Sequence, residues 1–559
     1  MKPFRYRELP QLPRLAWLAV MNRDAGDVLI YHGSALECRD HWMVEGTWDG
    51  EFALGGFHES EHFFGSGIRA VGDAVHFVPS SALVNGVYCC ERRRELLVSN
   101  SLILLLAFTG ARLDPDHDYR AETYAIRHGA ERYARDFTVV HREIKAFSQV
   151  YDLSLVAKAP ADVPLEFASA RPAPAVPTYA RYRELVDRAL QRLRVNYTSA
   201  DRRAPLGVFA TISSGYDSAA VAALVKDLGV EAYFTCRRSN THIPRWLSRR
   251  AAIDDGTPIA RALGGEGGGG RLTTIELDTR DSRVTDDELY FLAPGCAPPS
   301  LALHGLARHI ERRRPAVLFT GFLGDEVWDR NPWERRYQDE GIIRGDTTAL
   351  MLSEIRLKSG FVNVPVPALC ARRVQDLAVL SESTEMAPWR LGTRDYDRPI
   401  PRRILEEAGI PRAMFAGRKK AVVQTYTWPR HRTLRPSYFA EVRARYGRRA
   451  GFVYLHRAAN RMAFWWFRGY HLLRRRLWGI EPPDTPAVLV GARYDFAYLQ
   501  FLWAARTLSE RFAGLLKSSG VVPVPLERRR RTPPRTLPPG APALGGGSRS
   551  RAASADPTR

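Results

Sequence analysis

Residues 206–224, LGVFATISSGYDSAAVAAL, constrain the fold of this chain more than any other segment. They begin as a short apolar run typical of a buried strand, pass through a serine- and glycine-rich loop at 213–218, and continue as a helix of small apolar residues. A second strand pattern, EAYFTCRR, starts at Glu231, and a third, AVLFTGF, starts at Ala316. Strand, helix and strand at this spacing predict the βαβ unit of a parallel sheet, and therefore an α/β fold.

The loop 213–218 is expected where the carboxyl end of a strand meets the first turn of a helix. Backbone N–H groups and the helix dipole favour an anion there, and the hydroxyl groups of Ser213, Ser214 and Ser218 add donors. Asp217 would repel a phosphate unless a divalent cation such as Mg²⁺ lay between them. A serine-rich turn that only caps the helix is the alternative explanation of these six residues taken alone.

Residues Ser213 to Ser218 resemble the SGGxDS pyrophosphate loop of the adenylating ATP pyrophosphatases, the PP-loop superfamily, which needs no Walker-type lysine. With the strand before it, the loop is similar to the synthetase domain of asparagine synthetases. The resemblance implies a doubly wound parallel sheet that binds ATP and Mg²⁺. Its nucleotide-binding residues would be Ser213, Ser214, Gly215, Asp217 and Ser218, although Ser214 replaces the second glycine of the family pattern.

Two later segments extend the resemblance. DDGTPIARALG, 254–264, is similar to an acidic segment of the family, and TGFLGDEVWD, 320–329, resembles its SGEGxDE loop. By this resemblance Asp325 would be the second Mg²⁺ carboxylate beside Asp217, and Gly321 would lie against ATP.

A basic segment completes the expected catalytic set. RPIPRRILEEAGIPRAMFAGRKKAV, 398–422, is similar to a later segment of the family that ends in a basic R-x-K, in which Lys420 would reach the phosphates. The expected catalytic residues are therefore Lys420, Asp325 and Glu326. Taken alone, the run 418–420 is equally compatible with a solvated basic surface.

Residues 1–155 alternate between short apolar runs and turn residues, which predicts a β-rich domain of two packed sheets with a helical stretch at 121–137. Its segments EGTWDGEFALGGF, 45–57, and ERRRELLVSN, 91–100, resemble the Ntn-type glutamine amidotransferase domain. The domain would be degenerate, because the chain begins Met-Lys where glutamine-dependent members begin Met-Cys. Cys89 and Cys90 fall inside an expected strand and are predicted to be core residues. Glutamine hydrolysis should therefore be absent, and the amine would come as free ammonia, from a partner or as part of the substrate.

The expected boundaries follow proline, glycine and charge patterns. A proline-rich linker is predicted at 156–178, a synthetase-like domain at 179–520 with a mainly helical part from about 370, and a disordered Arg/Pro/Gly-rich tail at 521–559. The synthetase-like domain should open with a helix, because one helical face carries Tyr182, Leu185, Val186, Ala189, Leu190 and Leu193.

The resemblance implies an ATP-dependent amide-forming ligase that activates a small-molecule or peptide carboxylate as an acyl-adenylate. Phe322 replaces the glutamate of asparagine-forming members and cannot move a proton. A natural-product or peptide amide synthetase similar to the lasso-peptide cyclases, and a non-catalytic nucleotide-binding homologue, are therefore alternatives. A related pyrophosphatase acting on tRNA is another, but neither a zinc-type cysteine motif nor an RNA-binding module is evident.

Charge and composition limit the expected partners. The formal charge is +21, and eight arginines against two acids in residues 526–559 supply +6 of it, so no specific nucleic-acid role is predicted. The arginine- and tryptophan-rich stretch 461–479 is compatible with a membrane surface or with stacking on bases. We expect instead an amphipathic helix with buried aromatic residues, and therefore no membrane partner. The predicted location is the cytoplasm, and a homodimer remains compatible with the sequence.

Overall fold

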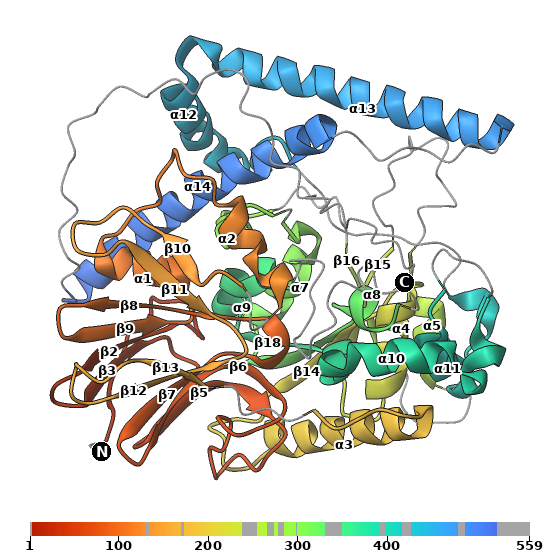
Figure 1. The fold of residues 1–559 in the computed structure, drawn as a ribbon, viewed down its shortest axis with the longest axis horizontal. Coiled ribbons are helices and arrows are strands. Elements are labelled where there is room, and N and C mark those ends of the chain that lie inside the picture. The colour runs from red at the N-terminus through yellow and green to blue at the C-terminus, as the bar shows by residue number, and fades with distance from the viewer. Residues whose placement is uncertain are drawn as a thin grey trace, which may run out of the picture.

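A computed structural model of the chain describes residues 3–129, 133–168, 173–237, 254–264, 273–277, 284–297, 299–329, 349–391, 397–415, 426–478 and 487–521. Two sheets pack face to face in the N-terminal half, and a third, parallel sheet lies beside them with helices around it (Figure 1). The chain is therefore a mixed α/β protein, as its sequence predicts.

The N-terminal sandwich consists of a seven-stranded sheet, in the order β1-β3-β2-β9-β8-β11-β10, and a six-stranded sheet, in the order β13-β12-β7-β6-β5-β4. Alternate residues of both sheets meet in a shared apolar core, as expected for two sheets packed face to face. The strands are β1 (Arg5–Glu8), β2 (Trp17–Asn22), β3 (Asp27–His32), β4 (Glu37–Arg39), β5 (Trp42–Trp48), β6 (Phe63–Val71), β7 (Ala74–Val78), β8 (Val87–Arg92), β9 (Glu95–Ser99), β10 (Asp136–Thr138), β11 (Ala146–Val150), β12 (Ser154–Lys158) and β13 (Glu166–Ala168).

The parallel sheet has the order β16-β15-β14-β17-β18, and every neighbouring pair in it is parallel. Its strands are β14 (Gly207–Thr211), β15 (Ala232–Cys236), β16 (Thr274–Leu277), β17 (Ala316–Thr320) and β18 (Phe361–Pro365). Successive residues of β14 face two different apolar clusters, Val208 and Ala210 on one side and Phe209 on the other. Both faces of the sheet are thus covered by apolar side chains, which is why its strands read as continuous apolar runs.

The helices cover the sheet and extend beyond it. Those of the described ranges are α1 (Leu102–Thr109), α2 (Arg120–Tyr124), α3 (Tyr179–Tyr197), α4 (Tyr216–Val225), α5 (Thr257–Gly264), α6 (Glu288–Leu292), α7 (His304–Glu311), α8 (Gly324–Val327), α9 (Ser353–Ser359), α10 (Val374–Glu382), α11 (Pro399–Glu407), α12 (Arg435–Tyr446), α13 (Ala450–Trp478) and α14 (Ala487–Ser518). Helices α3, α4, α10 and α11 contribute to one apolar cluster of the parallel sheet and α7 to the other. Helix α14 packs against α1 of the sandwich half.

Several elements agree with the sequence patterns. Helix α3 buries Tyr182, Val186, Leu190 and Leu193 on one face, with its first turn capped by the hydroxyl of Thr178, which accepts from the backbone of residue 181. The short apolar runs noted in residues 1–155 form strands, among them β2, β5, β7, β8 and β9. The loop at 213–218 joins β14 to α4, as predicted.

Three expectations need correction. The six-stranded sheet continues to Ala168, so β13 lies inside the range 156–178 that the prolines predicted to lack regular structure; it is a three-residue edge strand that contains no proline. The stretch 121–137 is only partly helical, because α2 and a 3₁₀ turn end at His128 and β10 begins at Asp136. The predicted tail lies outside the described residues, apart from Val521.

The third correction concerns the stretch 461–479. Residues 461–478 are helical, in α13, but the aromatic side chains are not buried: Trp466 is 76% exposed and Trp478 is 64% exposed. The amphipathic pattern predicted the helix correctly, but it does not reveal whether another element covers the apolar face. Within the described ranges, no helix is long and apolar enough to cross a membrane.

A buried ionic network joins the sandwich to the parallel-sheet half. The guanidinium group of Arg356 in α9 donates to both oxygens of Glu45 in β5, at 2.8 and 2.9 Å, and both side chains are almost fully buried. Beside them, the hydroxyl group of Ser101 donates to the two oxygens of Glu354 at 2.9 and 2.8 Å. Because β5 also packs against α3 and β18, all seven of its residues are buried.

Candidate nucleotide-binding site

Two loops lie side by side at the carboxyl edge of the parallel sheet. Residues 212–215 lead from β14 into α4, and residues 321–323 lead from β17 into α8. Because β14 and β17 are hydrogen-bonded neighbours in a parallel sheet, their carboxyl ends meet at one edge. This is the edge at which open α/β sheets bind ligands.

The first loop is held in shape by its own serines. The hydroxyl groups of Ser213 and Ser218 lie 2.7 Å apart, and the backbone N–H of Gly215 donates to the Ser213 hydroxyl at 3.1 Å. The hydroxyl group of Ser214 donates to Oδ1 of Asp254 at 3.0 Å. Serine at position 214, where the resembled family has glycine, is thus accommodated by a hydrogen bond to the acidic segment.

The first turn of α4 is suited to an anion. Gly215 is its N-cap residue and provides no side-chain cap to the helix N–H groups. The following small residues, Ala219 and Ala220, are fully buried against the sheet, so the helix sits close to the strand ends. Backbone N–H groups, the positive end of the helix dipole and serine hydroxyl groups therefore gather at one partly exposed place.

Two glycines allow the loops to touch. A Cβ atom on Gly321 would lie 2.6 Å from the backbone nitrogen of Ser218, and one on Gly324 would lie 2.5 Å from Cγ of Asp217. Between these glycines, Leu323 adopts a left-handed conformation with φ of 66°. Both glycines are thus needed for the close approach of the second loop to the start of α4.

The acidic segment after β15 closes a third side. Asp254 is 3% exposed, and Asp255 forms an isolated β-bridge with Ser213. A carboxylate oxygen of Asp255 also accepts from the backbone and hydroxyl groups of Thr257, at 2.9 and 2.6 Å, at the start of α5. The segment 254–264, expected to be acidic and then helical, therefore lies against the serine loop.

An arginine that the sequence reasoning missed holds Asp217. Nη1 of Arg398 lies 2.5 Å from both carboxylate oxygens of Asp217. The arginine side chain is 1% exposed and the aspartate side chain is 25% exposed. The proline-rich sequence around residue 398 gave no signal for this pairing, because the two residues are far apart along the chain.

A second buried arginine in α11 supports the start of α4. Arg402 donates to Oδ1 of Asp397 at 2.9 Å and also to the phenol oxygen of Tyr216. Burial raises the pKa of Tyr216, and the nearby guanidinium of Arg402 opposes that rise. The first turn of α4 is thus fixed from the side of α11 by two arginines.

The other expected site residues divide into two groups. Asp325 and Glu326 lie in the first turn of α8 and are half-buried, and Phe322 packs partly buried against two apolar clusters. The expected set from Ser213 to Ser218 therefore lies together with Gly321, and Asp325 follows in the same loop region. Lys420 lies outside the described residues.

The donors at this site suit an anion better than they suit a bare cation. Serine hydroxyl groups and helix N–H groups donate to anionic oxygens. Asp217 has oxygen ligands of the kind Mg²⁺ prefers, but Arg398 already neutralises it. A cation at Asp217 would have to share that carboxylate with Arg398.

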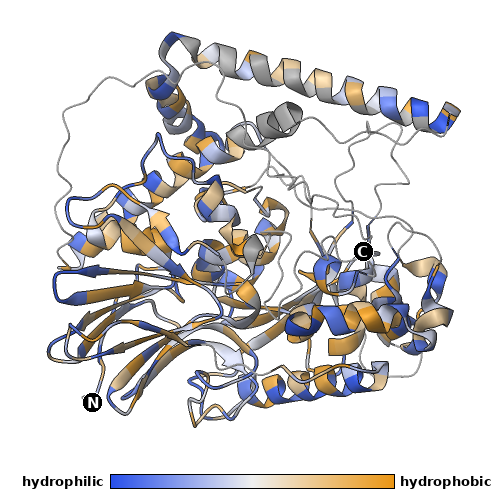
Figure 2. Cartoon of the chain, in the orientation of Figure 1, coloured by the Kyte–Doolittle hydropathy of each residue, from blue (hydrophilic) through white to orange (hydrophobic). Residues whose placement is uncertain are grey.

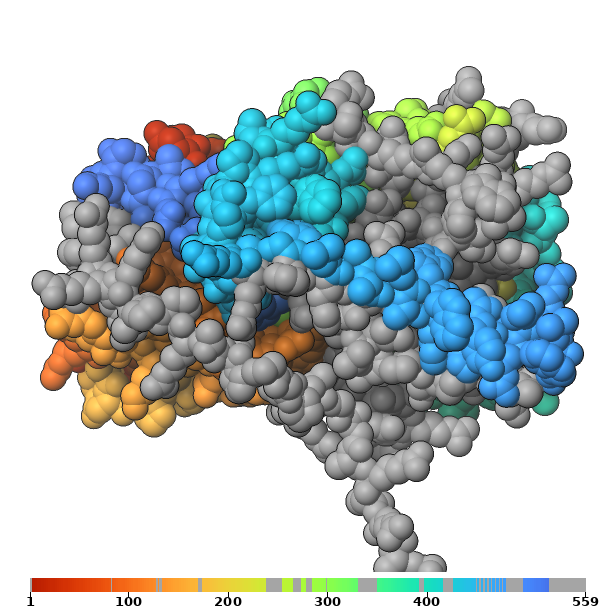
Figure 3. Space-filling model, turned by 90° about the horizontal axis from the view of Figure 1, so that it is seen from above, coloured from red at the N-terminus to blue at the C-terminus, as the bar shows by residue number. Residues whose placement is uncertain are grey.

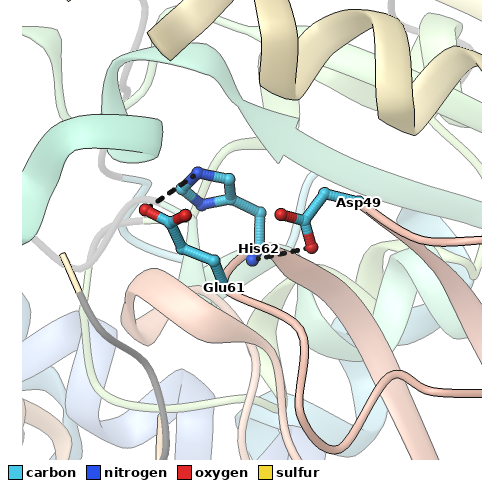
Figure 4. A group of neighbouring side chains, drawn as sticks. All are labelled: Asp49, Glu61 and His62. Atoms are coloured by element: carbon cyan, nitrogen blue, oxygen red, sulfur yellow. Dashed lines mark hydrogen bonds and ion pairs between the residues drawn. The ribbon is translucent and has the colours of Figure 1, made fainter. Parts of the chain in front are cut away.

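A second polar cluster lies where the sandwich meets α3. The ligand atoms of Asp49, Glu61 and His62 lie within 4.8 Å of one another, and the backbone N–H of His62 donates to Asp49 at 3.2 Å (Figure 4). The cluster lines a cavity of about 370 Å³, together with several arginines, among them Arg188 and Arg192. Burial, and then the negative charge of Asp49, raise the pKa of Glu61, and the arginines oppose this. The surrounding positive charge disfavours a metal ion there.

The cysteines of the sandwich are not activated. Cys89 and Cys90 are buried in β8, as predicted, and burial raises the pKa of Cys89 to about 12. Burial also raises the pKa of Cys38, which lies in β4, to about 12. These thiol groups stay protonated at neutral pH and do not have the character of catalytic nucleophiles.

Known protein families and curated proteins provide no relative of this chain. No protein-family model matches the chain, and no curated protein matches it at a significant level. The chemistry of the site must therefore be judged from its own geometry.

Proposed function

We propose that the chain is an ATP-dependent amide-forming ligase of the asparagine synthetase type. A substrate carboxylate attacks the α-phosphorus of ATP, pyrophosphate leaves, and an amine then displaces AMP from the acyl-adenylate. The observation that carries the proposal is the packing of the serine loop 213–218 against the glycine loop at 321–324, on neighbouring parallel strands. Open α/β sheets bind their ligands at the carboxyl ends of such neighbouring strands, so the two loops would contact different parts of one nucleotide.

The residues of the first loop have a defined part in this reaction. The hydroxyl groups of Ser213 and Ser218 and the N–H groups at the start of α4 would hold the leaving pyrophosphate through its anionic oxygens. Holding the phosphates in place aligns the α-phosphorus for attack and stabilises the charge that develops on the leaving group. Gly321 would lie against the nucleotide, and Lys420 is proposed to reach its phosphates.

Mg²⁺ would enter with the nucleotide, assigned by the resemblance to Asp217 and Asp325. Bound there, it would neutralise phosphate charge. Binding of Mg-ATP would then be coupled to the release of Asp217 by Arg398, because the carboxylate cannot bind the guanidinium group and the metal ion equally well at the same time.

The amide-forming half is proposed to proceed without a proton acceptor at position 322. Phe322 packs against apolar side chains and has no group that accepts a proton. Glu326, one turn further in α8, is the candidate acid or base of this region. An amine that arrives already neutral removes the need for such help.

The test is pyrophosphate release by the whole chain with ATP, Mg²⁺ and a panel of carboxylates that includes aspartate and short peptides. We expect release that depends on one class of carboxylate and that falls at least about tenfold in Ser213→Ala/Ser218→Ala. Arg403→Met is the control variant, since that residue lies on α11 and pairs with Glu385 and Glu407 and not with the serine loop. Pyrophosphate release that the serine variant retains would refute the site.

A nucleotide-binding regulator without catalysis is the second candidate. The Arg398–Asp217 ion pair favours it, because that pair occupies the proposed metal ligand. The two candidates differ in one measurement: a regulator binds ATP but releases no pyrophosphate with any carboxylate.

A further inference from the structure

Helix α13 exposes more large apolar side chains than any other described helix. Leu455, Met462, Trp466, Tyr470, Leu473, Leu477 and Trp478 are all between 47% and 76% exposed. In Figure 1 the helix runs across one side of the molecule, touching the rest mainly near its start, through α12 and α14. Figure 3, which views that side directly, shows most of its length at the surface.

Five of these exposed residues form one stripe. From Leu455 the next members, Met462, Trp466, Leu473 and Leu477, follow at spacings of seven, four, seven and four residues. At about 100° per residue these five positions fall within a sector of about 60°, and over the rise of an α-helix they span about 33 Å. The rings of Trp466 and Tyr470 stack along it, 5.9 Å apart and 7° from parallel. Figure 2 shows hydrophobic and hydrophilic residues interspersed along the helix, as on an amphipathic surface.

The charge of the same helix has one sign. Residues 450–478 include six arginines and neither an aspartate nor a glutamate. Arg476 is exposed next to the stripe, and the guanidinium of Arg474 lies 5.7 Å from the centre of the Tyr470 ring. A partner that covers the stripe must therefore accept an apolar surface and tolerate, or attract, a charge of about +6.

A second copy of the chain does not meet this requirement. Two such helices side by side would bring together a charge of +6 on each, and like charges repel. The stripe also drifts out of a seven-residue repeat: positions 469 and 476, which continue the series 455 and 462, are glycine and arginine. A coiled-coil contact between copies is therefore disfavoured.

A nucleic acid would match the arginines and the aromatic rings of the stripe but not its aliphatic side chains. Aromatic rings stack on bases, and arginines bind phosphates, but Leu455, Leu473 and Leu477 would gain nothing from such a partner. Aliphatic, tryptophan and tyrosine side chains along one face, with arginine as the charged residue, match the boundary between lipid headgroups and acyl chains.

We propose that α13 lies in the headgroup region of an anionic phospholipid bilayer, with the stripe from Leu455 to Leu477 directed toward the acyl chains. The helix is long enough to lie along the surface, but none of the described helices is apolar enough to cross a bilayer. Arginines beside the stripe then meet lipid phosphates. This inference does not depend on the proposed ligase activity.

The experiment is co-sedimentation of the whole chain with vesicles of phosphatidylcholine alone or mixed equally with phosphatidylglycerol. We expect binding to the anionic vesicles that weakens at least about tenfold in Trp466→Ser/Leu473→Ser, because two apolar side chains leave the interface. The matched control is Leu54→Ser/Val379→Ser, which removes two equally exposed apolar side chains elsewhere, 64% and 73% exposed, and should bind as the wild type does. Circular dichroism establishes that the variants keep their helices.

A second arm tests the charge. Arg474→Glu/Arg476→Glu, or 0.5 M salt, should reduce binding to anionic vesicles at least about threefold, since surface electrostatic attraction is screened within a few ångströms at such salt. The proposal is overturned by an absence of binding to anionic vesicles, by equal binding of the stripe variant, or by equal binding to neutral and anionic vesicles. It is also overturned if the stripe variants abolish dimerisation or oligonucleotide binding in place of vesicle binding.

Discussion

The ion pair between Arg398 and Asp217 makes a sharp prediction about nucleotide binding. If Asp217 is a ligand of the Mg²⁺ that accompanies ATP, Arg398 competes with that ion for the same two oxygens, each 2.5 Å from Nη1. Replacing the arginine by methionine, Arg398→Met, keeps most of the buried volume and removes the competing charge. The affinity for Mg-ATP should therefore increase.

The size of the increase follows from what the ion pair contributes. Hydrogen bonds to charged groups contribute about 1.5–3 kcal/mol, and Asp217 remains partly exposed, so the lower half of this range applies. Loss of the competitor should then strengthen Mg-ATP binding by about 10- to 40-fold. ATP binding without Mg²⁺ should not gain in this way, because the released carboxylate repels bare phosphates.

Isothermal titration calorimetry with ATP, with and without Mg²⁺, measures both quantities. Arg403→Met is the control, since it removes an arginine from α11, the helix that begins directly after Arg398, without touching Asp217. Weaker Mg-ATP binding in Arg398→Met would refute the reasoning and identify Arg398 as a phosphate ligand. Unchanged binding would remove Asp217 from the metal site.

Four further predictions test other parts of the molecule. Gly321→Ala should destabilise the fold by about 1–3 kcal/mol in chemical denaturation and weaken ATP binding, because its Cβ would lie 2.6 Å from the Ser218 nitrogen; unchanged stability would contradict the loop contact. Burial raises the pKa of Glu354 from 4.5 to about 7, so its contribution to stability is present below pH 4.5 and is lost as the pH rises through 7. Glu354→Gln should gain up to ~3 kcal/mol over the wild type between pH 5 and 8, and parallel pH profiles would argue against this. Phe322→Glu should raise ammonia-dependent amide yield up to ~100-fold at constant pyrophosphate release, if ammonia is the acceptor. A glutamate-release assay with glutamine should read background, since the described cysteines of the sandwich have raised pKa values; turnover would show that the first half has an active nucleophile.

The sequence predicted local features well, because short-range patterns carry them. The apolar face of α3, the strand before Ser213 and the small residues of α4 all appear within a few turns or strands of chain. The edge strands β16 and β18 were not predicted from the sequence; each is only four or five residues long.

Non-local pairings were beyond the reach of such patterns. Arg398 meets Asp217 only because α11 folds back onto α4, and nothing in either segment specifies that contact. The same limit applies to burial: the periodicity of α13 is that of a helix with one apolar face, and an apolar face looks alike whether protein, lipid or water lies against it. The contact between Gly321 and Ser218 was partly predictable from the sequence, because a glycine in a strand-to-helix loop already indicates a close approach of two backbones.

The ionic bridge between Glu45 and Arg356 has a consequence for how mutational data on this protein should be understood. Both charges are buried. Replacing either residue alone, or separating the sandwich from the parallel-sheet half, would leave the other charge buried without its partner and lower the free energy of unfolding by about 3–5 kcal/mol. A deletion or saturation scan would therefore score Glu45 and Arg356 as indispensable in any assay that needs the folded chain, whatever their part in the proposed reaction. Loss of function caused by such substitutions would report misfolding. A folding assay run beside the activity assay would distinguish misfolding from a loss of chemistry.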